Sequence, residues 1–450
     1  MSLDPATLAL ADRLLVLPPQ QLPAWMHASP SSCPGPGDGL DAQTAATCLP
    51  AALERLAESH RCGQAPEPAD ALALLHLGEV LLPPPADPQA PPRTPAPQPA
   101  LEPVRQAADA LRRQLVGDTV TYVRNRNLNT SNHCVLHCAF CAFRRDPDQP
   151  GAYRLPLTEL QQRAAEAQQL GATELCLQAA LDPEAQEQGS HLRWAETLLR
   201  GLQEAAPGIH LHAFSPQELL FIAQRDGLPL RQVLERLQQA GLGSVPGTAA
   251  EVLSDPVRRR LCPEKLTARE WVAVMLTVHG LGLASTATLM AGSIEGSADR
   301  VAHLLTLLAL QRHARQGGQR GFTEFVLLPF VGALAPTALR RQVGREQPDA
   351  AAMLLLTAQA RLLLGPWIIN HQPSWVKLTL PVAGEALHWG CNDLGGTLME
   401  EHITSMAGAQ GGTAQTVEAL VATAVTAGRP ARERTTLYGQ PVVRQSACRR

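Results

Sequence analysis

The sequence lacks a strong excess of charge of either sign. Its 450 residues carry 38 basic and 41 acidic side chains, which gives a formal net charge of −3. Nucleic-acid-binding proteins usually show a basic excess, so this class is not expected here.

Long apolar runs are also missing. No stretch reaches the ~18 consecutive apolar residues that a membrane-spanning helix needs. The chain begins Met-Ser-Leu-Asp, and Asp12 and Arg13 interrupt the first apolar stretch, which is not typical of a secretory signal. We therefore expect a cytoplasmic protein that binds neither membrane nor nucleic acid.

The composition allows a large buried core, because 45% of the residues are apolar and 18% are charged. The length fits two or three domains, or one α/β barrel with extensions. Ten cysteines in a large cytosolic chain do not indicate a disulfide framework. Three of them are clustered, and we expect Cys176, Cys262 and Cys391 to be ordinary buried or semi-buried thiols.

The N-terminal quarter differs in composition from the rest. Residues 1–82 are rich in Leu and Ala, with patches of helical spacing that predict a helical N-terminal extension. Ten prolines within residues 83–103 exclude helix and sheet and predict an extended linker, either an inert spacer or a docking site for a proline-recognition module. We assign residues 104–440 to one domain and residues 441–450 to a C-terminal tail. If residues 1–80 are only an extension, removing them should spare the chemistry.

Short strand-like runs alternate with longer helical runs from about residue 119 onwards. Roughly eight such units predict an α/β protein, a TIM-type (β/α)8 barrel, in which chemistry lies at the carboxyl ends of the strands. Capping boxes are expected where Thr158, Ser215, Thr248 and Thr267 begin helices. The expected strands are 119–125, 173–178, 210–214, 243–246, 284–290, 323–329, 368–372 and 386–391.

Cys134, Cys138 and Cys141 form a C-x3-C-x2-C motif in the loop after the first expected strand. Thiolates bind zinc or iron–sulfur clusters, and three of them can hold three irons of a 4Fe–4S cube, which leaves one iron open. The alternative is a zinc site with His133 or His137 as the fourth ligand. Each histidine directly precedes a cysteine, and no second cysteine pair follows downstream, which makes zinc the less suitable metal.

This motif resembles that of the radical S-adenosylmethionine (SAM) superfamily. The resemblance implies a radical SAM barrel with a 4Fe–4S cluster whose open iron binds SAM, and chemistry that starts from a 5′-deoxyadenosyl radical. Phe140, just before the last cysteine, also fits the superfamily pattern, although core packing explains an aromatic residue there equally well.

The flanking segments narrow the resemblance. Residues 127–132 and 141–144 are similar to enzymes of deazaflavin synthesis and of futalosine-pathway menaquinone synthesis. Further blocks, within a resemblance that covers roughly residues 104–439, resemble the FO synthase subunit 2 (CofH) family. They are residues 210–216, 246–251, 321–325, 370–377, 392–401 and 428–439.

The family resemblance implies a transferase that moves the 4-hydroxybenzyl group of L-tyrosine to 5-amino-6-(D-ribitylamino)uracil, a step in the synthesis of the deazaflavin FO. It also implies FO synthase subunit 1 as functional partner and a low-potential flavodoxin or ferredoxin as electron donor. Two alternatives stay open. One is a radical SAM enzyme of menaquinone synthesis with another acceptor, and the other is a cluster-binding scaffold without turnover. No residue is assigned as catalytic base.

The same resemblance points to Phe140, Gln178, Ala179, Ala180 and Ser215 as SAM contacts. Backbone carbonyls of residues 178–180 are expected to meet the methionyl amino group. A helix that begins after Ser215 could present amides to a carboxylate, although Ser215 could serve the cap alone. Polar side chains near strand ends are candidate substrate contacts, and for each a structural hydrogen bond is about as good an explanation. They are His212, Glu324, Asn370, His371, Gln372 and Asn392.

The sequence departs from the family pattern at three places. Ala179-Ala180 stands where a Gly-Gly pair is usual, Ser293 where a histidine is usual, and Thr130 at a commonly aromatic position. Alanine disfavours a positive φ and adds a methyl group, which bears on the SAM pose. A shifted substrate, reduced activity and neutral drift are all compatible with these changes. The basic run 258–260 is expected to be a solvated helix face.

Overall fold

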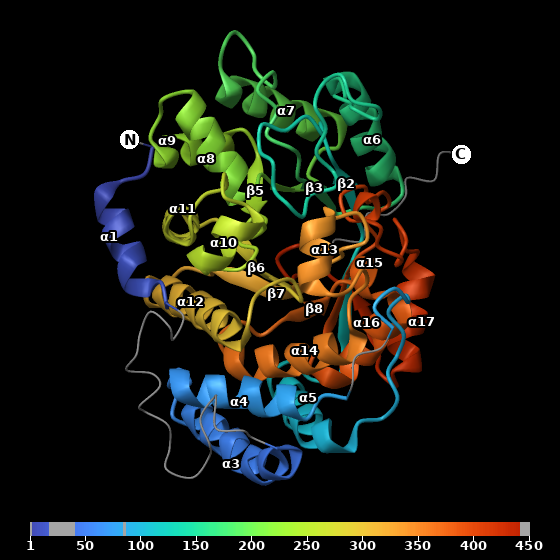
Figure 1. The fold of residues 1–450 in the computed structure, drawn as a ribbon. Coiled ribbons are helices and arrows are strands. Elements are labelled where there is room, and N and C mark those ends of the chain that lie inside the picture. Colours follow the sequence, from blue (N-terminus) through green and yellow to red (C-terminus); the bar gives the residue numbers. More distant parts are fainter. Residues whose placement is uncertain (1, 18–40, 84–86, 442–450) are drawn as a thin grey trace.

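The computed structural model describes residues 2–17, 41–83 and 87–441 (Figure 1). Of the expected C-terminal tail, residues 442–450 lie outside these ranges. No helix within them is both long and apolar enough to cross a membrane. Buried apolar side chains from the N-terminal helices and from the strand-rich part of the chain belong to one continuous core.

Seven parallel strands pair in the order in which they occur in the chain (Figure 1). The register is regular where the cavity lies, with Glu174 opposite His210 and Cys176 opposite His212. The sheet consists of β2 (Asn125–Leu128), β3 (Glu174–Leu177), β4 (His210–Ala213), β5 (Leu242–Val245), β6 (Ala284–Ala291), β7 (Phe322–Pro329) and β8 (His371–Pro373).

A second, three-stranded parallel sheet connects the two edges of the first. Asn392 joins them, because its amide donates to the His371 carbonyl at 3.1 Å and its carbonyl accepts from the Thr121 amide at 2.9 Å. The predicted (β/α)8 architecture is confirmed, with β1 and β2 together in the first strand position and β9 in the last. The second sheet has the order β10 (Ala431–Glu433), β1 (Val120–Val123), β9 (Asp393–Gly396).

Helices cover the outside of the barrel (Figure 1). They are α6 (Leu157–Gln169), α7 (His191–Ala205), α8 (Pro216–Arg225), α9 (Leu230–Gln239), α10 (Asp255–Leu261), α11 (Ala268–Gly280), α12 (Ser297–Gln316), α13 (Thr337–Val343), α14 (Ala350–Leu364), α15 (Trp375–Leu378), α16 (Leu380–Ala386) and α17 (Val417–Thr426), with the 3-10 turns η3 (Leu387–Trp389) and η4 (Ser405–Ala407). The capping boxes expected at Ser215 and Thr267 are confirmed. Those at Thr158 and Thr248 are wrong, because α6 begins at Leu157 and residues 248–253 form an irregular loop.

The first and last expected strands differ from the structure. The run 119–125 is interrupted at Arg124, and its two halves pair with different neighbours. The strand expected at 386–391 is wrong, because these residues end α16 and form η3. Leu387 and Trp389 are buried against neighbouring helices, so a short apolar helical turn imitates the alternation of a strand.

The region before the barrel is helical and packs directly on it. Pro-rich residues add backbone contacts, since the Pro88 carbonyl accepts from the amides of Glu346 and Gln347. The exclusion of helix from residues 83–103 is wrong at the end of this range, because a 3-10 turn covers Pro99–Leu101 and a helix begins at Glu102. The domain boundaries at 82 and 103 stay predictions. The N-terminal helices are α1 (Pro5–Leu14) on α11 and α12, α3 (Ala42–Arg61) on α4, α4 (Pro68–Val80) on α12 and α14, and α5 (Glu102–Val116) on α14, with η2 (Pro99–Leu101) before it.

Candidate active site

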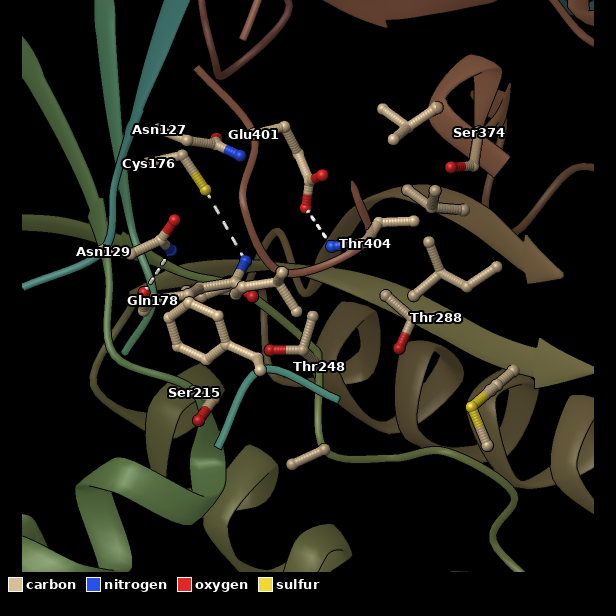
Figure 2. Close-up of a pocket in the computed structure, with 18 of the residues that line it drawn as sticks. Asn127, Asn129, Cys176, Gln178, Ser215, Thr248, Thr288, Ser374, Glu401 and Thr404 are labelled. Atoms are coloured by element: carbon tan, nitrogen blue, oxygen red, sulfur yellow. Dashed lines mark hydrogen bonds between the residues drawn. The ribbon is translucent and has the colours of Figure 1, made fainter. Parts of the chain in front are cut away.

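The barrel contains a cavity of about 400 Å3 at the carboxyl ends of its strands. Side chains of β2, β3, β4, β6, β7 and β8 form its floor and walls, and the loops after β2, β3, β5 and β9 complete it. Figure 2 shows Asn127, Cys176 and Glu401 projecting around this space. The size is typical of a small-molecule site, and its position is the one that barrel enzymes use for catalysis.

All three clustered cysteines line one side of the cavity. Cys134, Cys138 and Cys141 are free and half-buried in the loop between β2 and α6. The loop is held by neighbouring segments, since the Val135 amide donates to the Leu181 carbonyl at 3.1 Å and the Ala139 amide donates to the Leu261 carbonyl at 2.8 Å. Burial raises the pKa of Cys138 to about 12, so its thiolate needs a strong positive partner.

The neighbouring histidines are directed elsewhere. The exposed His137 ring has Nδ1 3.3 Å from Glu264 and Nε2 2.7 Å from Arg144, and His133 Nδ1 lies 3.4 Å from Arg154. Across the described ranges, no three His, Cys, Asp or Glu side chains are arranged to hold a single metal ion. The zinc alternative thus lacks its fourth ligand, whereas three thiols spread along one loop fit a cluster of several irons.

The five expected SAM contacts also line the cavity, next to the cysteine loop. The segment 178–180 is tied to its surroundings. Asn129 Nδ2 donates to the Gln178 carbonyl at 2.6 Å, and the Ala180 amide donates to the Ser131 carbonyl at 3.1 Å. Gln178 Nε2 points to Cys176 Sγ at 3.5 Å (Figure 2).

Glu218 is a cavity residue that sequence reasoning used only as a cap. Its buried carboxylate accepts from the Ser215 amide at 2.7 Å, from the Ser215 hydroxyl at 2.6 Å and from the Ala179 amide at 3.1 Å. Burial raises the pKa of Glu218 to about 7 despite these donors. The helix cap and the expected SAM-binding segment therefore share one carboxylate.

The six candidate substrate residues separate into two groups of three. His212, Glu324 and Gln372 line the cavity, but Asn370, His371 and Asn392 do not. Asn392 accepts from Arg361 Nη2 at 2.9 Å and donates to Asn370 Oδ1 at 3.0 Å. Asn370 and Asn392 each directly precede a strand, His371 opens β8, and none of the three lines the cavity. Their hydrogen bonds hold strand starts together.

His212 faces the cavity together with Glu174. Its Nδ1 lies 2.6 Å from Ser244 Oγ, which is also 2.7 Å from His210 Nε2, so the two histidines share one side of β4. Only His212 lines the cavity. Burial lowers the pKa of His212 to about 4, so the ring is neutral at neutral pH and is available as a hydrogen-bonding group.

Glu324 belongs to a buried charge network with the C-terminal segment. Arg434 Nη2 donates to Glu324 at 2.9 Å, Arg434 also pairs with Asp393, and the Tyr438 hydroxyl donates to Glu324. Burial raises the pKa of Glu324 to about 7, although Arg434 opposes this. Arg434 lines the cavity and was not a candidate, because no local spacing links it to strand β7.

Two lysines complete the lining and were also not candidates. Lys265 Nζ pairs with Glu251 at 2.6 Å and lies 5.5 Å from the centre of the Phe140 ring, beside the cysteine loop. Lys377 follows β8 on the short helix α15. Lys265 lies outside every family-like block and Lys377 ends the block 370–377, and the tertiary structure brings both lysines to one cavity.

One basic run has a different role from the one expected. Arg259 and Arg260 are exposed, but the expectation of a solvated face is wrong for Arg258, which is buried. Its guanidinium donates to the carbonyls of Ala249, Ala250 and Leu266 at 3.2, 2.5 and 2.6 Å. These carbonyls belong to the two loops that carry Glu251 and Lys265.

Comparisons with known proteins agree with this geometry. Residues 128–307 match the radical SAM superfamily, and residues 319–445 match the CofH/MqnC C-terminal region. A relative from Cyanothece sp., named 5-amino-6-(D-ribitylamino)uracil–L-tyrosine 4-hydroxyphenyl transferase, is 56% identical over 337 residues, which cover 75% of this chain and 88% of the relative. The relative of the same name from Synechococcus elongatus is 56% identical over 74% of this chain and 87% of its own. The chain belongs to this transferase family.

Solved structures of other radical SAM enzymes share the fold of this transferase family member. Methylornithine synthase (PylB) has a TM-score of 0.60 at 15% identity and covers 85% of this chain and 97% of its own. The FeFe-hydrogenase maturase HydG from Carboxydothermus hydrogenoformans has a TM-score of 0.59 at 13% identity and covers 89% and 87%. At such low identity these likenesses concern the fold alone.

The three departures from the transferase family pattern produce no visible distortion. Neither Ala179 nor Ala180 has a positive φ, so alanine is accommodated there without backbone strain. Ser293 does not line the cavity, and its hydroxyl donates to Glu295 at 2.6 Å. Thr130 lines a small separate void behind residues 178–180. Of the three positions, only the Ala179-Ala180 pair lines the cavity.

Proposed function

We propose that this chain is a radical SAM transferase that moves the 4-hydroxybenzyl group of L-tyrosine to 5-amino-6-(D-ribitylamino)uracil in FO biosynthesis. The observation that carries the proposal is the 56% identity to relatives of that name over 88% of their length. The cavity supports it, because charged groups of both signs and neutral hydrogen-bonding groups line one enclosed space.

The residues fit the cofactors of the superfamily. Cys134, Cys138 and Cys141 would hold a 4Fe–4S cluster, and residues 178–180 with Phe140 and Ser215 would contact SAM. When bound, these cofactors supply the electron and the carbon radical that start the reaction. The chain holds the cysteine loop through the carbonyls of Leu181 and Leu261 and shapes the adjoining segment through Glu218.

The inner part of the cavity suits two polar substrates. Neutral His212, Gln372 and the Glu324–Arg434 pair would bind hydroxyl, amide and ring-nitrogen groups of the ribitylaminouracil. Apolar side chains of β6 and β7, Met290 and Val326 among them, limit the access of water to the reacting atoms. We further propose a cytoplasmic enzyme that works with FO synthase subunit 1 and with a flavodoxin or ferredoxin as electron donor.

The test is an anaerobic reaction of the cluster-reconstituted enzyme with SAM, a strong reductant, L-tyrosine and the ribitylaminouracil. Mass spectrometry should detect a 4-hydroxybenzyl–uracil adduct together with 5′-deoxyadenosine. Deoxyadenosine without the adduct would show that the enzyme starts the radical reaction but uses another substrate, for example a menaquinone-type acceptor. Neither product from a protein with a full cluster would contradict the proposal and favour a scaffold without turnover.

The cluster assignment is tested separately with Cys138→Ala. We expect this variant to bind less iron and sulfide and to form no deoxyadenosine, because one of three thiolate ligands is lost. Cys62→Ala is the matched control, since Cys62 is exposed at the end of α3 and hydrogen-bonds Glu58. Wild-type iron content and turnover in Cys138→Ala would show that the ligands are wrong.

A further inference from the structure

The chain contains two lysines among its 38 basic residues, and both line the cavity. Every other basic side chain is an arginine. Positive side-chain charge outside the cavity is thus supplied by guanidinium groups, and both lysine ammonium groups lie at the cavity. An ammonium group is a compact charge with three donors, which suits a single carboxylate in a narrow site.

The two lysines differ in their partners. Lys265 is paired with Glu251 at 2.6 Å. The Lys377 ammonium makes no hydrogen bond and no ion pair to any described part of the chain. Of the remaining cationic lining residues, Arg144 pairs with Asp146 and Arg434 with Asp393 and Glu324. Lys377 is therefore the cavity cation that is free to receive an anion.

A buried carboxylate lines the same cavity. Glu401, from the loop after β9, accepts from the Thr404 amide at 2.7 Å and from the Ser405 amide at 3.0 Å, one bond to each oxygen. Each oxygen keeps a lone pair for a further donor. Glu401 projects into the cavity in Figure 2.

Lys377 and Glu401 attract each other without being in contact. Burial lowers the pKa of Lys377, and the charge of Glu401 is the main influence that opposes this. A molecule that carries a carboxylate and an ammonium group on one carbon atom could bridge the pair and compensate both charges.

We propose that Lys377 and Glu401 form an α-amino-acid subsite, in which Lys377 binds the carboxylate and Glu401 the ammonium group. The inference rests on the proposed function, which makes L-tyrosine the amino acid. In this arrangement, the reacting side chain of the amino acid extends from the subsite toward the cysteine loop. Lys377 and Glu401 lie in the family-like blocks 370–377 and 392–401, but neither was a candidate substrate residue.

The decisive experiment compares ligands that lack one of the two charges. The cluster-reconstituted enzyme with SAM and without reductant is titrated with L-tyrosine, with tyramine, which has no carboxylate, and with 3-(4-hydroxyphenyl)propanoate, which has no ammonium group. We expect the wild type to prefer L-tyrosine over tyramine by about 10- to 100-fold. Lys377→Met should bind the two within about 3-fold of each other, because the carboxylate then has no partner.

The reciprocal variant separates the two roles. Glu401→Gln should lose the preference for L-tyrosine over the propanoate but keep the preference over tyramine, and Lys377→Met should show the opposite pattern. Lys377→Arg keeps the charge and should retain part of the preference over tyramine. Arg231→Met on the exposed face of α9 makes the same change of a cation to methionine outside the cavity and should leave all three affinities unchanged.

Chemical labelling gives a second readout that does not depend on a variant. Brief treatment with acetic anhydride followed by peptide mass spectrometry reports each lysine separately, because the chain has two. L-Tyrosine should protect Lys377 from acetylation, and tyramine should not. The extent of acetylation of Lys265 should be the same with either ligand.

Two results would overturn the inference. One is an unchanged preference for L-tyrosine over tyramine in folded Lys377→Met, and the other is equal protection of Lys377 by tyramine. If the wild type makes the adduct from L-tyrosine and either result is found, the subsite alone is wrong. If the wild type neither binds nor consumes L-tyrosine, the proposed function itself fails.

Discussion

Single buried carboxyl groups control the charge of this cavity. Burial raises the pKa values of Glu218 and Glu324 to about 7. Three hydrogen-bond donors oppose the rise at Glu218, and the charge of Arg434 opposes it at Glu324. Both groups therefore titrate near neutral pH, where the reaction would run. At this scale the sequence identified residue types but not their protonation, since that depends on burial and on neighbours distant in the chain.

Glu218 allows a pH test of stability. Its folded-state pKa of about 7 lies above the ordinary value of 4.5, so the folded protein holds the proton more tightly than the unfolded chain. The stabilisation is complete below about pH 4.5 and is lost as the pH rises through 7, a change of about 3 kcal/mol. In Glu218→Gln this loss should be absent, so urea unfolding at pH 5 and at pH 8 should differ less than in the wild type.

The exposed Glu204 on α7 provides the matched control for this measurement. Glu204→Gln makes the same chemical change on the surface and should keep the wild-type difference between the two pH values. A Glu218→Gln variant with the full wild-type difference would show that Glu218 is ionised throughout.

Loops, together with the first and last expected strands, are the elements whose structure the sequence did not predict. The Ser215 and Thr267 caps were predictable because both partners lie within four residues. The loop at residues 248–253 shows the same Thr-x-x-Glu spacing and is not a helix. The Arg258 guanidinium donates hydrogen bonds to backbone carbonyls of this loop. A local motif is thus overridden where a buried guanidinium offers the backbone a competing set of hydrogen bonds.

Arg258 should therefore be needed to hold the two loops that carry Glu251 and Lys265 in their folded conformation. Arg258→Met leaves several buried carbonyls without a donor, and we expect a loss of about 3 kcal/mol in the free energy of unfolding. Arg259→Met changes the exposed neighbour and should cost less than about 0.5 kcal/mol. Denaturant unfolding of the two variants provides the comparison, and equal stability would contradict the buried role.

On the scale of the whole molecule, the N-terminal helices are part of the barrel's support. Leu74 and Leu75 of α4 are almost completely buried, and the Leu74 carbonyl accepts from Gln359 of α14 at 3.1 Å. A side chain at Gly78 would meet Gln359 at 2.4 Å, so the two helices are in close contact. Removing residues 1–80 would expose this apolar surface of α12 and α14.

We expect Leu74→Ala to lower the free energy of unfolding by about 2–5 kcal/mol, because it leaves a cavity between α4 and the barrel. The activity of the folded enzyme should not change, since the residues that line the cavity begin at Val123. Leu170→Ala, at a side chain 64% exposed, should cost less than about 0.5 kcal/mol. Equal urea midpoints for the two variants would show that the N-terminal helices are an independent extension.

The sequence by itself determined the barrel, the cysteine motif and the family, because alternating periodicity, helix caps and ligand spacing are encoded within short segments. It also indicated His212, Glu324 and Gln372, which the structure places on the cavity. Only the tertiary structure separated these from Asn370 and Asn392, which do not line the cavity, and only it brought Lys377 and Glu401 to one cavity. The reason is physical: which side chains share a cavity depends on strand register and loop packing between residues far apart in the chain, and no local pattern records those contacts.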